Sequence, residues 1–366
     1  MLRYIWLSLS IVFFLNSAYA VNEGVVSLFE DETEVQSKSK SKAKEKKSKE
    51  DVKADKESFF SFMDLNMPKN SFFSDNEQEE KPKTIEDTIK LADRGSLQAQ
   101  LDVAYSYLYG ENGLKVDQAK AFEYYSKAAM QNDPIALNNL GSLYYGGIGV
   151  KRSSSKAAVL FKKAADLGNS EAAVNIGFMH ASGNGAAKNM EKALDYFEKA
   201  ASSDNVAAKF MLGYAYYTGK YRDIDYVKAA PLLKEVADAG FDEAQSIVAN
   251  IYINGLGFPQ NYNNAVKYLN KAIMQGNTKA MIILADILLE GKKYNKDVPY
   301  AHVLYNLAAV RGVPGASQKR NNVESTMKID EVLMAQQRAE GFKEELSETT
   351  SYIRKTYGNS ISSYFD

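Results

Sequence analysis

A fixed interval of 36 residues recurs through most of this 366-residue chain and constrains its fold more than any other feature. Small and apolar residues return at this interval in columns. One column holds only alanine, a second only glycine, and a third only aromatic residues or leucine. One spacing kept through several columns indicates an array of repeats rather than a chance pattern. The columns are Ala121, Ala157, Ala193, Ala229, Ala265 and Ala301; Gly147, Gly183, Gly219, Gly255 and Gly291; and Tyr125, Phe161, Phe197, Leu233, Leu269 and Tyr305.

Each repeat has the pattern of two helices. In the copy at 134–168, Leu140 and Leu143 follow a helical period in the first half, and Leu160 and Phe161 do so in the second. A glycine-bearing loop joins the halves, and glycine suits a tight turn because it accepts positive φ at little steric cost. Since one helix pair cannot bury its apolar face, stacked neighbours must cover it. The pattern predicts an all-α solenoid of about six helix-turn-helix repeats of 36 residues, with capping helices.

The segment LGSLYYGGIGV…SKAAVLFKKAADLGNSEA resembles the Sel-1-like repeat, a relative of the tetratricopeptide repeat. The resemblance covers about residues 84–312 and implies a right-handed α/α superhelix. Two departures alter loops and contacts but not the helix pairs. Ala249 and Ala285 replace a glycine of the other repeats, and the fourth and sixth loops read GKYRDID and GKKYNKD without the usual Gly-Val. Some secreted members of the family are rich in cysteine, whereas this chain has none, which excludes a disulfide framework.

Residues 1–20 have the form of a secretory signal peptide. Arg3 gives a basic start, an apolar stretch follows, and Ala18-Tyr19-Ala20 supplies the small residues of a cleavage site. An uncleaved anchor helix is the alternative. No later stretch approaches the ~20 apolar residues that span a bilayer, and no Asn-x-Ser/Thr sequon occurs. We therefore expect an exported protein, periplasmic or secreted, with no transmembrane span after signal removal.

Residues 21–83 differ in composition from the rest of the chain. The run SKSKSKAKEKKSKED has no apolar face and cannot offset the entropy of ordering, so it predicts a disordered, lysine-rich arm. Weak contact of its lysines with anionic surfaces is one role, and a plain linker is the alternative. Further along, exposed aromatic residues are typical of a docking motif, or else they cover the first helix pair. These residues are Phe59, Phe60, Phe62, Phe72 and Phe73.

The repeat array has a predicted beginning and end. A half-repeat at 84–96 opens it, and Pro314 and Gly315 break the helix that closes it. We expect residues 313–345 to form a C-terminal capping region that shields the open apolar end of the stack. The tail, 346–366, is polar and receives no role. The apolar face of the capping helix is expected to hold Ile329, Val332, Leu333, Ala335 and Ala339.

The sequence contains no catalytic constellation. Of its two histidines, His180 falls in a packing column held elsewhere by tyrosine, and His302 has no histidine at ligand spacing. The loops GGIGV and GNGAAK lack the preceding strand of a phosphate-binding loop. A net charge of −1 gives no global signature of nucleic-acid binding. We therefore expect no catalytic residue, no cofactor, no metal ion and no nucleic-acid partner.

Two classes of function remain. The resemblance implies a protein–protein interaction scaffold or adaptor of the bacterial envelope or secreted space. First helices line the concave side of tetratricopeptide-like stacks, so the resemblance also implies that a peptide or protein binds there. The alternative is an envelope enzyme, or the partner of a cell-wall enzyme or hydrolase. A eukaryotic lumenal adaptor is a further alternative, which the missing sequons and missing C-terminal membrane span disfavour.

A stripe of positions spaced i, i+4, i+7 on the first helices is the candidate binding surface. Residue type varies along it while neighbouring columns stay fixed, as expected where a ligand is read. The alternative is that its aromatic rings fill the seam between adjacent repeats. The stripe predicts Phe178, Phe210, Tyr214 and Tyr217 as a central contact patch, Asn250 and Asp286 as polar selectivity residues, and Tyr105 as a further protein-binding residue.

Overall fold

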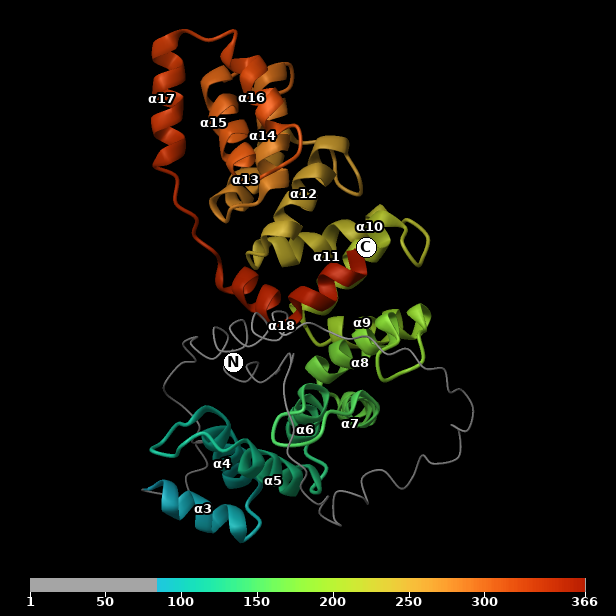
Figure 1. Cartoon of the computed structure of the whole chain (residues 1–366). Helices are drawn as coiled ribbons and strands as arrows, with labels where there is room; N and C mark the ends of the chain where they lie inside the picture. Colours follow the sequence, from blue (N-terminus) through green and yellow to red (C-terminus); the bar gives the residue numbers. More distant parts are fainter. Residues whose placement is uncertain (1–83, 366) are drawn as a thin grey trace, which may run out of the picture. The chain divides into compact units, whose positions relative to one another are not determined.

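The computed structural model describes residues 84–365, which contain sixteen helices and no strand (Figure 1). Two compact units make up this range, an N-terminal unit up to Ser203 and a C-terminal unit from Asp204 to Ile361. The predicted signal peptide and lysine-rich arm lie outside the described residues. Between residues 84 and 365, none of the helices has both the length and the apolar character needed to cross a bilayer.

Six helix pairs follow one another along the chain, which confirms the predicted all-α solenoid. Within each unit, the second helix of a pair also packs against the first helix of the next pair. The first helices are α4 (Leu97–Tyr109), α6 (Pro134–Gly146), α8 (Ser170–Ser182), α10 (Val206–Thr218), α12 (Asp242–Asn254) and α14 (Thr278–Glu290). The second helices are α5 (Gln118–Ala129), α7 (Ser154–Asp166), α9 (Met190–Ala201), α11 (Tyr226–Asp238), α13 (Tyr262–Met274) and α15 (Val298–Val310).

Polar side chains begin almost every repeat helix. Before α5, for example, the Asp117 carboxylate accepts a hydrogen bond from the backbone N–H of Lys120, and Asp297 caps α15 in the same way. Such caps satisfy N–H groups that have no partner inside the helix. Before the first helices, this cap column holds Ser96, Asp133, Asn169, Asn205 and Asn277, and only α12 breaks it, with Phe241.

Glycine ends every first helix. Gly147, for example, has a φ of 73°, a left-handed conformation that costs glycine little. A second glycine follows two residues later, and a different constraint requires glycine there. A Cβ on Gly149 would lie 2.0 Å from the carbonyl oxygen of Gln118, at the start of the preceding repeat's second helix. The loop therefore rests directly on backbone of the neighbouring repeat, which explains the Gly-x-Gly pattern. In the fourth repeat Tyr221 takes this place and keeps a φ of 77°.

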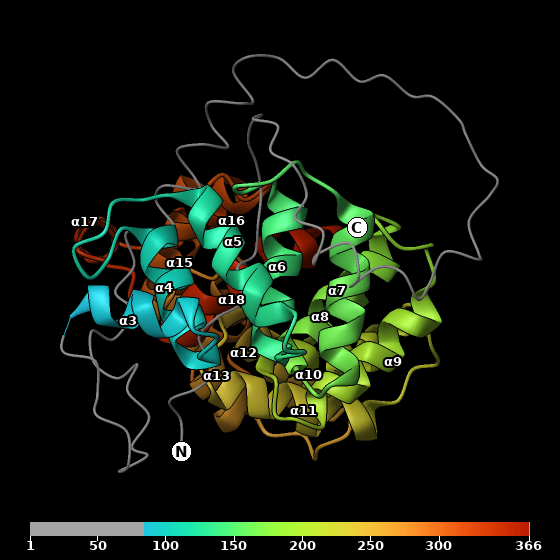
Figure 2. The same cartoon turned by 90° about the horizontal axis from the view of Figure 1, so that it is seen from below.

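Short helices flank the repeats. α3 (Ile85–Asp93) packs against α4 as the predicted half-repeat, with Ala92 fully buried. At the other end, α16 (Ala316–Glu324) and α17 (Ile329–Glu340) pack against α15 (Figures 1 and 2). The prediction of which α17 residues are buried is only half right. Ala335 and Ala339 are buried, whereas Ile329 is 81% exposed and Leu333 is 56% exposed. The last helix is α18 (Glu348–Phe365), in the tail that received no role.

Candidate protein-interaction surface

The stripe of three positions on each first helix is not uniformly exposed. Its first position, i in the spacing i, i+4, i+7, is buried in four consecutive repeats, as Asn138, Val174, Phe210 and Ser246. Its third position, such as Tyr217 on α10, is partly exposed in several repeats. Since a partner can contact only what solvent can reach, the surface available for binding narrows mainly to the third position of the last five repeats and the second position of the last three.

Two of the predicted binding residues belong to the N-terminal unit. Tyr105 on α4 is 4% exposed, and its ring centroid lies 4.6 Å from that of Tyr109. Phe178 on α8 is 8% exposed and meets Phe197 edge to face, with 5.2 Å between ring centroids. Phe178 therefore takes part in packing between the two helices of its repeat, whereas Tyr105 is buried against a ring of its own helix.

Phe210, Tyr214 and Tyr217 lie on α10 in the C-terminal unit. Phe210 is fully buried and meets Phe241 edge to face at 4.7 Å. Tyr214 and Tyr217 are partly buried, and burial raises the pKa of both hydroxyls above the ordinary value. The three residues thus run from the interior at Phe210 toward solvent at Tyr217.

A hydrogen bond joins this tyrosine edge to the next repeat. The side-chain amide of Asn250 on α12 donates to the Tyr217 hydroxyl, with 2.8 Å between nitrogen and oxygen. Asn254, one turn later, donates to the Asn250 side-chain oxygen at 2.6 Å. Asn250 is therefore held in place at both ends of its amide. The structure brings together Tyr214, Tyr217 and Asn250 on two neighbouring first helices.

Asp286 on α14 has a different setting. Its carboxylate accepts a hydrogen bond from the Tyr305 hydroxyl at 2.5 Å and pairs with the Lys319 ammonium of α16 at 2.7 Å. Burial and this hydrogen bond raise the pKa of the Tyr305 hydroxyl. Asp286 remains exposed, but it already has a cation on the helix beyond its own repeat.

The N-terminal unit carries a polar cluster that the sequence reasoning missed. Burial raises the pKa of Asp102 on α4 to about 6, although a hydrogen bond from Gln98 opposes the change. Burial also raises the pKa of Tyr125, with Tyr109 and Asp102 acting in the same direction. The side chain of Asn139 is fully buried in the same cluster, where it acts on the pKa of Tyr125 in the opposite direction. The available signal was the pair Asn138-Asn139 inside an otherwise apolar helix.

No metal centre emerges among residues 84–365. His180 stacks on Tyr196 with 5.8 Å between ring centroids, which agrees with a packing position. His302 is fully buried, with its Nε2 3.2 Å from the Glu324 carboxylate. In this part of the chain, no group of three or more histidine, aspartate or glutamate side chains is placed to hold a metal ion.

Comparisons with known proteins give one family and one fold. The family model described as Sel1 repeat matches residues 97–133, 134–169, 170–205, 206–241, 242–277 and 278–312. A comparison with curated proteins gave no match.

Two similar solved structures illustrate the fold. One is a protective antigen of uropathogenic Escherichia coli with an SLR fold, at 22% identity and a TM-score of 0.52. That match covers 74% of this chain and 66% of the antigen, just under two thirds of its length. The other is a Sel1 repeat protein from Oxalobacter formigenes, at 24% identity and a TM-score of 0.53, with 70% of this chain and 96% of that one covered.

Proposed function

Because the chain belongs to the Sel1 repeat family, whose repeats commonly act in protein–protein interaction, we propose that it is a scaffold that binds a peptide or protein. The family is generally non-enzymatic. The proposed binding surface is the exposed part of the first-helix stripe in the C-terminal unit. We further propose that the protein works in the bacterial envelope or secreted space, which the signal-peptide form of residues 1–20 supports.

One observation carries the choice of surface. Tyr214, Tyr217 and Asn250 form a partly exposed edge that spans two first helices and is fixed by a hydrogen bond of 2.8 Å. Tyrosine gives a large apolar contact area and a polar end while losing little side-chain entropy, and such residues are frequent interface anchors. A fixed edge of this kind lowers the ordering cost of binding. Asp286, on the following first helix, adds an exposed polar group whose charge is paired with Lys319.

The test is the double variant Tyr214→Ala, Tyr217→Ala in the exported chain. Affinity capture with the unchanged protein should retain a partner that mass spectrometry identifies, and the variant should bind this partner at least about tenfold more weakly. The melting temperature should fall only slightly, because both rings are partly exposed and one hydrogen bond is lost. Tyr262→Ala is a matched control, since Tyr262 is a partly buried tyrosine on a second helix. A large fall in melting temperature with retained binding would instead give these rings a purely structural role.

A further inference from the structure

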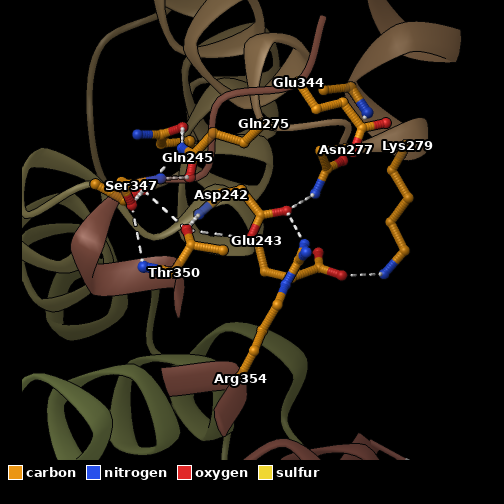
Figure 3. Close-up of polar contacts among 12 residues, drawn as sticks. Asp242, Glu243, Gln245, Gln275, Asn277, Lys279, Glu344, Ser347, Thr350 and Arg354 are labelled. Atoms are coloured by element: carbon orange, nitrogen blue, oxygen red, sulfur yellow. Dashed lines mark hydrogen bonds and ion pairs between the residues drawn. The ribbon is translucent and has the colours of Figure 1, made fainter. Parts of the chain in front are cut away.

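The helix α12 is the one first helix of the six that lacks a capping side chain of its own. Phe241 stands where the other repeats have serine, aspartate or asparagine, and it makes no side-chain cap. An acceptor for a different N–H of this helix end comes from α18, more than one hundred residues further along the chain. The backbone N–H of Asp242 donates to the Thr350 hydroxyl at 3.1 Å. The break in the repeat pattern therefore coincides with the place where α18 docks (Figure 3).

Asp242 itself is the centre of this contact. Its side chain is fully buried, and its Oδ2 receives hydrogen bonds from Asn277 at 3.0 Å and from the Arg354 guanidinium at 2.7 Å. Figure 3 shows Arg354 reaching from α18 toward this carboxylate. A buried carboxylate needs a paired charge or good hydrogen bonds to offset its lost hydration. Arg354 supplies the opposite charge, in a charge-assisted bond of short length.

Recognition continues along the same face of α18. The Ser347 backbone N–H donates to the Gln275 side-chain oxygen at 3.0 Å, and the Ser347 hydroxyl donates to the Gly240 carbonyl at 2.9 Å. Ser347, at the start of the helix, Thr350 and Arg354 are spaced i, i+3, i+7, which places them on one helix face. Ile353 and Tyr357 are buried as well, so polar and apolar contacts act together.

A similar arrangement in the N-terminal unit shows which residues are particular to this site. There, Gln131 donates to Gln100 at 2.8 Å and to the Gly95 carbonyl at 3.0 Å, just as Gln275 donates to Gln245 and Gly240. The helix that begins at this turn, α4, has its own capping side chain, Ser96. The glutamine pair thus also occurs where α18 does not bind, whereas Phe241 and buried Asp242 distinguish the place where α18 binds.

We propose that Gly240, Asp242, Gln275 and Asn277 form a docking site for a helix that carries a hydroxyl, a hydroxyl and an arginine at positions i, i+3 and i+7. Its resident occupant is α18, which binds reversibly. The segment before α18 holds it close, because Glu344 pairs with Arg311 and the Glu345 N–H donates to the Met274 carbonyl. This tether gives α18 a high effective concentration. The proposal is independent of the first-helix stripe.

The experiment uses the full chain and a fluorescein-labelled peptide of residues 344–358. The variant Thr350→Ala, Arg354→Ala weakens the resident contact and should bind the peptide at least about tenfold more tightly than the unchanged chain does. Adding Asp242→Asn to this variant should abolish binding. A peptide with Arg354→Ala should bind about 10- to 100-fold more weakly. A peptide with Lys355→Ala is the matched control and should bind normally, since Lys355 is exposed on the same helix.

Two outcomes would overturn the proposal: no peptide binding to the double variant, or equal binding of the Arg354→Ala peptide. A second measurement covers a variant that folds poorly. In the single variant Arg354→Ala, amide hydrogen exchange in the first turn of α12 should become about tenfold faster. The first turn of α10, which Asn205 caps, should not change. Unchanged exchange in α12 would mean that α18 does not hold this helix end and would contradict the proposal.

Discussion

Replacing Gly177 with alanine tests the close packing of helices within a repeat. Gly177 lies on α8, and a Cβ there would be 2.7 Å from Cε1 of Phe197 and 3.3 Å from the Ala193 carbonyl oxygen. Phe197 is fully buried, so its ring has little room to move. The two helices therefore approach each other closely only because position 177 has no side chain.

Two opposing terms set the size of the effect. Alanine favours a helix over glycine by about 1 kcal/mol. Overpacking a well-filled core costs typically about 1–3 kcal/mol. A contact as short as 2.7 Å on a fully buried ring favours the upper part of that range. We expect Gly177→Ala to lower the free energy of unfolding by about 1–2 kcal/mol after the helix term is subtracted.

The fifth repeat suggests a second substitution that should relieve the close contact. At the equivalent positions it holds Ala249 and Leu269, both fully buried. Adding Phe197→Leu to Gly177→Ala recreates that pair, so Gly177→Ala should cost about 1 kcal/mol less in the leucine background. Urea denaturation followed by circular dichroism gives the four free energies of the cycle. A stabilisation by Gly177→Ala in the native background, or the absence of coupling with Phe197→Leu, would refute the close-contact reasoning.

Three further predictions concern other parts of the chain. Ala193→Leu should lower the free energy of unfolding by about 1–3 kcal/mol in urea denaturation, because Ala193 is fully buried at a helix contact, and an unchanged midpoint would contradict this. Burial raises the pKa of Asp102 to about 6 from 3.8, so its contribution to stability is present below about pH 4 and lost as pH rises through 6. The change in the free energy of unfolding caused by Asp102→Asn should therefore be more favourable at pH 8 than at pH 4 by about 1–3 kcal/mol. Parallel pH profiles of the urea midpoints of the two proteins would contradict this. Export should leave Val21 as the first residue, and an intact Met1 terminus on soluble envelope protein would show otherwise.

Local sequence patterns were sufficient for the repeat fold. The 36-residue columns predicted the helix pairs, and the glycine column predicted left-handed helix ends such as Gly147. These features depend on residues that are near in sequence or one repeat apart. The same reasoning worked less well where packing depends on particular neighbours. Phe210 belongs to a column of varied residues that suggested a surface, yet it is fully buried because Phe241 packs against its ring.

The docking of α18 lay beyond the repeat pattern. Its contacts join residues such as Asp242 and Arg354, which are 112 positions apart and belong to no common column. A local signal did exist, since Phe241 interrupts a column of capping residues. That signal shows that α12 lacks a capping side chain but not which segment of the chain contacts this helix end instead. Likewise, the raised pKa of Asp102 arises from burial by surrounding helices, which no spacing in the sequence reveals.

Photo-cross-linking in cells that naturally produce the protein tests the proposed binding surface most directly. The probe benzoylphenylalanine replaces Tyr217 in one variant and Val227 in another; Val227 is 75% exposed on the second helix α11. A partner held on the first-helix stripe should give a protein adduct from position 217 and none from position 227. Adducts of equal yield at both positions, or an adduct from position 227 alone, would contradict binding at the first-helix stripe.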